Sequence, residues 1–297
     1  MLYGSDALRK EIMNDAFSYA QDNNLKLVYA AMVGSISQGL QYANSDYDTR
    51  FLYVREDFPQ KICNPSEMGE ADLVHRYYPK GKVYEWIPFW EITSFLRFVC
   101  SPRFKTEFSV GLYNIVGWTF QSPYTWDPYG LKSILVPMLH RAFNAEYKIA
   151  YHRSVLDKYR NDWYMEDIIA KSLLYSMHSA ATIEWSLRYN EEPPVNIFSL
   201  LFGLGHKEIG KVVEKILIEA RRKCKDEIEN GKNELHASHF SVMTKMSPLL
   251  LPYLEENYQS ACSKEIPSVN EKSVLDIVDS MEDLLEMTIC SEQCMLG

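Results

Sequence analysis

The sequence lacks the long apolar runs and the cysteine patterns that mark several large classes of protein. No stretch approaches the roughly 18 consecutive apolar residues of a membrane-spanning helix. The first residues mix charges into an amphipathic pattern, unlike a signal peptide, so we expect a cytoplasmic protein. The six cysteines form neither a disulfide framework nor a paired CxxC zinc site. Cys290 and Cys294, four residues apart, are interpreted as a reduced pair on a terminal helix.

An excess of positive charge is also missing. The 40 acidic residues outnumber the 31 Lys and Arg residues, so the formal net charge is −9. Non-specific affinity for nucleic acid comes mostly from Lys and Arg side chains that neutralise phosphates, so the net charge argues against broad electrostatic binding of nucleic acid. A local basic groove remains open. Residues 221–223 with Lys225 form one basic cluster, which on a charged helix is typical of a solvated face. The seven histidines show no HxH or HExxH spacing and predict no zinc site.

What is present is the composition of a globular protein, with 46% hydrophobic and 24% charged residues in a chain of 297. Hydrophobic periodicity predicts a helix over 5–24, a buried strand over 25–35 and a second strand over 48–54. Two β-prone runs within 73–89 predict a hairpin, and a helix is expected to begin near Trp90. Residues 1–130 are therefore predicted to form a small mixed β-sheet with flanking helices.

Strand signals vanish after about residue 130. The predicted helices are 131–160, 164–190, 207–229, 240–258 and 270–289. We therefore expect an α/β (α+β) fold in which residues 131–297 form an all-α domain.

The predicted strand 25–35 ends in Gly34-Ser35, and Ser37 and Gly39 follow in a turn. Glycine lets the backbone approach an anion closely, and backbone N–H groups and hydroxyls at a strand end can donate to it. This pattern predicts that Gly34, Ser35 and Ser37 bind the phosphates of a nucleotide.

Asp46 and Asp48 lie two residues apart at the head of the second strand. Side chains at i and i+2 of a strand point to one face, so the two carboxylates converge within about 5–7 Å. They repel each other unless a cation lies between them, and Mg²⁺ (or Mn²⁺) prefers carboxylate and phosphate oxygens. Arg50 shares that face and is expected to clamp a phosphate. The alternative is a capped turn whose aspartates only accept bonds from backbone N–H groups.

Gly-Ser followed about ten residues later by the Ser-Asp-Tyr-Asp of 45–48 resembles the signature of the DNA polymerase β superfamily. Residues 34–54, 88–112 and 168–202 further resemble the YcgL-like, RNA-ligase-associated nucleotidyltransferases. The resemblance implies a two-metal enzyme that moves a nucleoside monophosphate from a nucleoside triphosphate to a hydroxyl. The acceptor implied is an RNA end, a protein side chain or a small molecule.

The resemblance also implies a third carboxylate, on the strand just before Trp90, that binds metal and acts as general base on the acceptor hydroxyl. Glu85 is the acid on that strand, although its offset from Trp90 is one residue longer than the family pattern. The alternative is a strand glutamate paired with a nearby lysine. Glu91, Asp72 and Glu70 are weaker substitutes.

Lys171, Tyr175 and His178 stand at i, i+4 and i+7 on one predicted helix. The resemblance implies that this helical domain covers the nucleotide, with Lys171 reaching the triphosphate and Tyr175 stacking on the base. A tyrosine on such a helix is equally typical of a core position. His178 stands where the family tends to have arginine, which weakens the case for a cationic phosphate contact there.

These expectations define a metal-dependent nucleotidyltransferase with Asp46, Asp48 and Glu85 as its catalytic carboxylates. Two alternatives remain. One is a catalytically silent nucleotide-binding or regulatory protein on the same scaffold. The offset of Glu85 and the histidine at position 178 in place of arginine would fit such a loss of activity. The other is a helical interaction protein whose function depends on residues 205–297.

Overall fold

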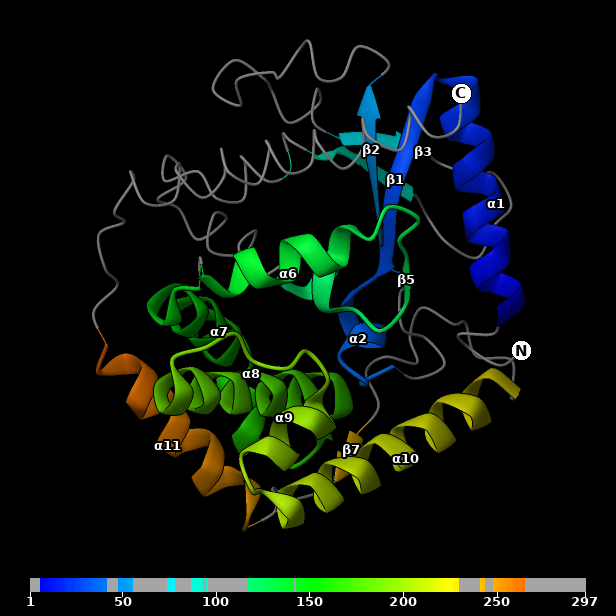
Figure 1. The fold of residues 1–297 in the computed structure, drawn as a ribbon. Helices are drawn as coiled ribbons and strands as arrows, with labels where there is room; N and C mark the ends of the chain where they lie inside the picture. The colour runs from blue at the N-terminus through cyan, green and yellow to red at the C-terminus, as the bar shows by residue number, and fades with distance from the viewer. Residues whose placement is uncertain are drawn as a thin grey trace.

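The computed structural model describes residues 6–41, 48–55, 74–77, 87–92, 95, 117–141, 143–229, 241–243 and 248–264. Within these residues, strands and one helix near the N-terminus are followed by a largely helical part, and the two lie against each other (Figure 1). The expected α+β fold is confirmed. No helix in the described ranges is both long and apolar enough to cross a membrane.

The described sheet has five strands in the order β3-β4-β2-β1-β5. β2 runs parallel to β4, and the other neighbouring pairs are antiparallel, so the sheet is mixed as expected. The strands are β1 (Leu25–Met32), β2 (Thr49–Arg55), β3 (Val74–Tyr77), β4 (Ile87–Glu91) and β5 (Thr125–Trp126).

Helix α1 (Asp6–Asp22) covers one face of this sheet and lies beside β1 in Figure 1. Ile12, Ala16 and Ala20 are spaced four residues apart, so they form one stripe along the helix, and all three are buried. They pack in one cluster with strand residues that include Phe51. The predicted helix and the first two predicted strands are therefore confirmed, with ends that differ by a few residues.

β4 continues through Trp90 to Glu91, so the helix predicted to start near Trp90 begins two residues later, at Ile92. Phe89, Trp90 and Glu91 are all buried, so this strand is covered on both faces. A strand buried on both faces has a continuous apolar run instead of an alternating one, and periodicity cannot separate such a run from a helix. Helical backbone is found further along, at Ile92 and Phe95.

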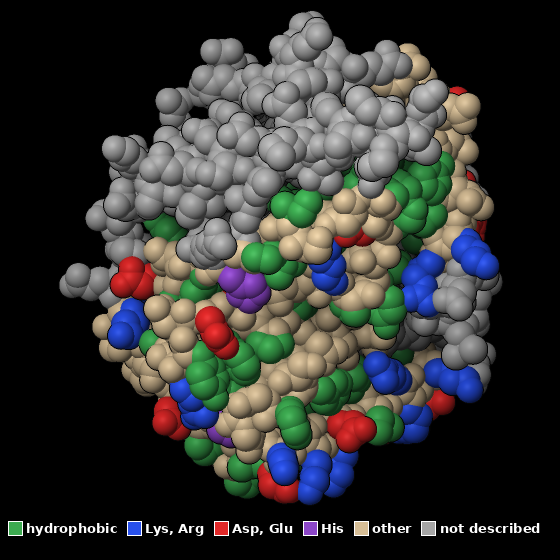
Figure 2. Space-filling view, in the orientation of Figure 1, with side chains coloured by type: hydrophobic (Ala, Val, Ile, Leu, Met, Phe, Trp, Pro, Cys, Tyr) green, Lys and Arg blue, Asp and Glu red, His purple; other side chains and the backbone are tan. Residues whose placement is uncertain are grey.

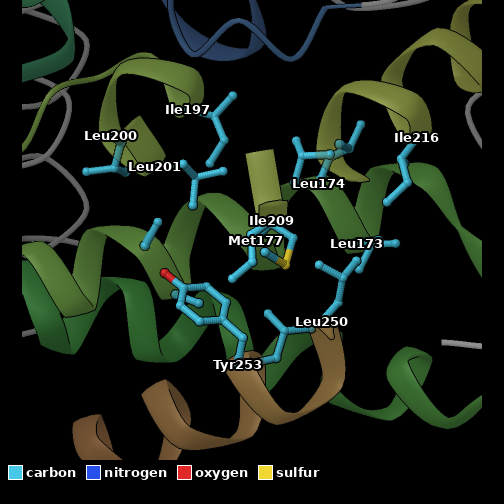
Figure 3. Close-up of a cluster of buried hydrophobic side chains, with 14 of the residues drawn as sticks. Leu173, Leu174, Met177, Ile197, Leu200, Leu201, Ile209, Ile216, Leu250 and Tyr253 are labelled. Atoms are coloured by element: carbon cyan, nitrogen blue, oxygen red, sulfur yellow. The ribbon is translucent and has the colours of Figure 1, made fainter. Parts of the chain in front are cut away.

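The helical part is built around α8 (Ala170–Tyr189), whose two sides are both largely buried. Leucine, isoleucine and methionine side chains from α8 and its neighbours meet in one large core (Figure 3). The other helices described in this part of the chain are α6 (Leu131–Arg141), α7 (Ala145–Tyr159), the 3-10 helix η1 (Arg160–Tyr164), α9 (Ile197–Gly203), α10 (Lys207–Glu229) and α11 (Leu250–Cys262).

Several helix boundaries differ from those predicted. The segment 131–160 is divided in two, because the Asn144 side chain accepts hydrogen bonds from two backbone N–H groups and starts α7. Short strands β6 (Ile168–Ile169) and β7 (Ser241–Met243) pair where only helix was expected. α11 consequently begins about ten residues later than predicted. The predicted helix 270–289 lies outside the described residues.

Candidate active site at the glycine-serine turn

The segment after β1 forms a single helical turn, α2 (Gly34–Ser37). Gly34 and Gly39 both have positive φ, +62° and +75°, in the left-handed region that favours glycine. The Leu40 N–H donates to the Ser35 carbonyl oxygen at 2.8 Å, and the Ser37 hydroxyl donates to the Gly34 carbonyl oxygen at 2.9 Å. The turn is thus closed by its own bonds, and the hydroxyl hydrogen of Ser37 is used within it.

Asp48 lies directly beside Gly34. The Val33 N–H donates to the Asp48 carbonyl oxygen at 2.8 Å, which joins the end of β1 to the residue before β2. A Cβ atom added to Gly34 would overlap the Asp48 carboxylate. Position 34 therefore requires glycine for two reasons, its φ and the space taken by the carboxylate. The Asp48 side chain is otherwise exposed.

Arg50 lies on β2, two residues after Asp48, and its side chain is half-buried. Its Nη1 donates to the Thr49 carbonyl oxygen at 2.7 Å, whereas its buried Nε has no hydrogen-bond partner among the described residues. Burial lowers the pKa of the Arg50 guanidinium, and the neighbouring Asp48 charge opposes that shift. The group stays protonated because an arginine pKa is far above neutral. A desolvated cation with an unused donor suits an anionic ligand.

The residues described at this turn fit part of a magnesium site. Asp48 offers an exposed carboxylate, a hard oxygen ligand of the kind that Mg²⁺ prefers. Asp46 and Glu85, the other two expected ligands, lie outside the described residues. Among the residues that are described, no group of three His, Cys, Asp or Glu side chains is placed to hold a metal. The metal set itself stays a prediction.

The structure rules out Glu91 as a substitute for Glu85. Glu91 pairs with Tyr53 in the parallel β2–β4 ladder, five residues beyond Asp48. At about 3.3 Å per residue, this register separates the two backbones by roughly 16 Å along the sheet. This register places Glu91 at the opposite end of β2 from the glycine-serine turn, and its side chain is buried there. The other two substitutes, Asp72 and Glu70, lie outside the described residues.

Lys171 and Tyr175 are both half-buried on α8. The Tyr175 ring lies 6.4 Å from the Tyr159 ring at the end of α7, which places it in the α7–α8 interface. His178 is buried, and its Nε2 lies 2.8 Å from the Val195 carbonyl oxygen. Burial lowers the pKa of His178 to about 4. The residue is therefore neutral at pH 7 and provides no cation to a phosphate.

The glycine-serine turn docks onto the helical part through contacts that the sequence did not reveal. The Ile197 N–H at the start of α9 donates to the Gln38 carbonyl oxygen at 2.9 Å. A Cβ on Gly39 would lie 2.5 Å from Asn196 Nδ2. Leu40 belongs to the large helical core. In Figure 1, α2 accordingly lies between the lower end of β1 and the helices around α9.

The basic cluster on α10 consists mostly of paired side chains. Arg222 forms ion pairs with both Glu219 and Asp226, and Lys223 lies 3.7 Å from Glu219. In Figure 2, blue and red side chains alternate along the lower edge of the described surface, over α10. This surface is a mixed, solvated face, as the sequence predicted, and carries no continuous positive patch.

A mixed sheet with a glycine-serine turn packed against an aspartate at the head of the next strand is consistent with a polymerase β-like nucleotidyltransferase. Residues 8–60, which run from α1 past β2, match the family described as "RlaP: RNA repair pathway DNA polymerase beta family". The chain is also 21% identical over 276 residues to "Uncharacterized protein YcgL" of Bacillus subtilis (strain 168). That match covers 86% of this chain and 100% of YcgL. The resemblance expected from the sequence is confirmed.

Proposed function

We propose that the protein is a nucleotidyltransferase that transfers a nucleoside monophosphate from a nucleoside triphosphate to a hydroxyl and releases pyrophosphate. The observation that carries this proposal is the contact between the Asp48 carboxylate and Gly34. It brings a candidate metal ligand and a candidate phosphate-binding turn together at the same edge of the sheet. The family match over residues 8–60 covers this same turn.

Each residue has a distinct role in this proposal, including Asp46 and Glu85, which lie outside the described residues. The Gly34–Ser35 backbone approaches the terminal phosphates, and Arg50 neutralises charge on the triphosphate from a desolvated position. Asp46, Asp48 and Glu85 would hold two Mg²⁺ (or Mn²⁺) ions, which would supply charge stabilisation for phosphoryl transfer. Glu85 accepts the proton of the acceptor hydroxyl. The protein thus contributes mainly positioning and electrostatics.

Lys171 and Tyr175 remain candidates for contacts from the helical domain, residues 131–297. Tyr175 is held in place by Tyr159, so base stacking would use its opposite face or edge. An RNA 3′ end is the acceptor that we favour, because the matched family is described as belonging to an RNA repair pathway. The net charge of −9 and the paired cations of α10 favour a short, local contact with that end over a long electrostatic groove.

The test is incubation of the protein with Mg²⁺, each of the four nucleoside triphosphates in turn, and an RNA bearing a 3′ hydroxyl. Pyrophosphate release and mass spectrometry of the RNA are the two readouts. Asp46→Asn and Asp48→Asn should abolish product, and Glu85→Gln should reduce turnover. The matched control is Asp22→Asn, at an exposed aspartate at the end of α1, which should retain full turnover.

Two outcomes would contradict the proposal. Nucleotide binding without pyrophosphate release, unaffected by Glu85→Gln, would identify a catalytically silent nucleotide-binding protein. No affinity for any nucleoside triphosphate would favour a helical interaction protein.

A further inference from the structure

A buried ion pair joins α7 to the segment between α8 and α9. Lys148 Nζ lies 2.6 Å from Glu192 Oε1, and the two side chains are only 1% and 5% exposed. A Cβ on Gly117 would lie 2.5 Å from the same Glu192 oxygen, so the Gly117 backbone packs closely against the Glu192 carboxylate. Removal of one partner from such a pair leaves a buried, uncompensated charge, which makes this contact a strong constraint on the position of Glu192.

A second anchor fixes the same segment three residues later. His178 Nε2 lies 2.8 Å from the Val195 carbonyl oxygen, and the ring is buried on α8. Because a carbonyl oxygen can only accept, Nε2 carries the hydrogen and is the donor in this bond. His152 lies beside it, with ring centroids 5.8 Å apart, and its Nδ1 is 3.1 Å from Ser179 Oγ. Burial, with the nearby Lys148 charge adding to it, lowers the pKa of both rings, so both are neutral at pH 7.

Between these anchors the chain is stiff, and beyond them it contacts the glycine-serine turn. Pro193 and Pro194 lie between Glu192 and Val195, and proline fixes φ. Asn196 follows, and its Oδ1 accepts hydrogen bonds from two backbone N–H groups, at 3.0 and 3.3 Å, that start α9. Its amide nitrogen packs against Gly39, as described above. A rigid segment thus leads from two buried anchors to the candidate phosphate-binding turn.

We propose that residues 192–197 act as a positioning strap that holds the glycine-serine turn in its nucleotide-binding shape. Lys148, Glu192 and His178 are positioning residues in this scheme, because they act on the turn only through the strap. The inference rests on the proposed function for its catalytic consequence, but the mechanical link itself can be measured without any activity. Loosening the strap lets residues 34–40 fluctuate, so the turn binds triphosphate less well.

The first test compares His178→Leu with His178→Gln. Leucine cannot donate to the Val195 carbonyl oxygen, which is left buried without a partner, whereas a glutamine amide can donate to it. In His178→Leu, hydrogen–deuterium exchange of peptides covering residues 34–41 should accelerate about tenfold, and the KM for nucleoside triphosphate should rise by about the same factor. In His178→Gln, both quantities should return toward those of the wild type.

The second test addresses the ion pair. Glu192→Gln alone leaves Lys148 charged and buried, and this variant can fail to fold. The double variant Lys148→Met with Glu192→Gln removes the buried charges at similar volume, which is often tolerated. The double variant should fold and still show faster exchange over 34–41 together with a raised KM, because the anchor on Glu192 is lost.

The KM readout separates positioning from general destabilisation. A variant that is partly unfolded has fewer active molecules, which lowers the apparent kcat and leaves KM unchanged. Glu184→Gln is the matched control. Glu184 lies on the same helix as His178 but accepts hydrogen bonds from Tyr253 and His206, away from the strap. This variant should lower the melting temperature and leave exchange over 34–41 and KM at wild-type values.

Unchanged exchange over 34–41 in both His178→Leu and the double variant would overturn the inference. That result would leave the proposed function standing if Asp48→Asn still abolishes turnover. Conversely, if the wild type shows no turnover at all, the exchange measurement alone decides the inference, and only the proposed function fails.

Discussion

Gly39 packs directly against the side-chain amide of Asn196, at a point where the turn after β1 meets the start of α9. The amide cannot move away easily, because Asn196 Oδ1 accepts hydrogen bonds from the Phe198 and Ser199 N–H groups. Gly39 also has a φ of +75°. Two independent constraints, backbone conformation and space, therefore act on one residue at this junction.

Gly39→Ala should lower the free energy of unfolding by about 3 kcal/mol, because it adds a steric overlap to left-handed strain of roughly 1–2 kcal/mol. Gly205→Ala is the matched control. Its φ is +83°, but a Cβ there meets nothing within 4 Å, so only the strain contributes. Urea unfolding of both variants gives the comparison. Equal losses would show that the contact with Asn196 contributes nothing.

Arg50→Met should weaken nucleoside triphosphate binding by about 10- to 100-fold without lowering stability. The reason is that the arginine is desolvated and its Nε has no partner in the part of the chain that the structure describes. An apolar side chain of similar length therefore removes a desolvation cost from the folded protein. Calorimetric titration and thermal melting measure the two effects. A fall in melting temperature of several degrees with unchanged affinity would assign Arg50 a structural role only.

Stability should decrease as the pH falls from 6.5 toward 4. Burial lowers the pKa of His178 from 6.5 to about 4, so between these values the unfolded chain binds more protons than the folded protein. The stabilisation by neutral His178 is fully present above pH 6.5. At pH 5 the free energy of unfolding is lower by about 2 kcal/mol. Burial also lowers the pKa of His152, chiefly by desolvation, which adds in the same direction.

Urea unfolding of the wild type and of His178→Gln at pH 7 and pH 5 checks this prediction. The glutamine variant should lose markedly less stability between the two pH values, because its side chain does not titrate. An identical loss in both proteins would show that His178 does not contribute.

Arg222→Ala should change RNA affinity less than twofold and leave its salt dependence unchanged. The guanidinium already forms ion pairs with Glu219 and Asp226 on the exposed face of α10, so little positive charge is left for phosphates. Fluorescence anisotropy with a labelled RNA over a series of salt concentrations measures both quantities. A shallower salt slope in the variant would reveal a phosphate contact at this position.

Local pattern was sufficient for α1, whose two faces differ, and for β1, a short β-prone run that is buried on both faces. The spacing of Ile12, Ala16 and Ala20 predicted α1, and a short β-prone run ending in Gly-Ser predicted β1 and the turn after it. The start of the helix after β4 was placed about two residues early, because β4 is buried on both faces and lacks the alternation that would mark its end.

The sequence of α7 contained one sign that Lys148 and His152 are buried and have partners elsewhere in the chain. Lys148 and His152 are spaced with Ile149 and Leu156 along one face, so two polar side chains fall on an apolar stripe. Such a position requires a buried partner, but nothing in the local sequence says which one. The partners, Glu192 and Ser179, come from elements far along the chain.

The sequence by itself determined the glycine-serine turn, the Asp-x-Asp motif and the order of α1, β1 and β2 around them, because each of these depends on neighbouring residues and their local conformational preferences. Only the tertiary structure decided that Asp48 lies against Gly34, that Glu91 is at the far end of the sheet, and that residues 192–197 contact the turn. These relationships depend on strand register and on the packing of helices, which bring together residues that no local pattern connects.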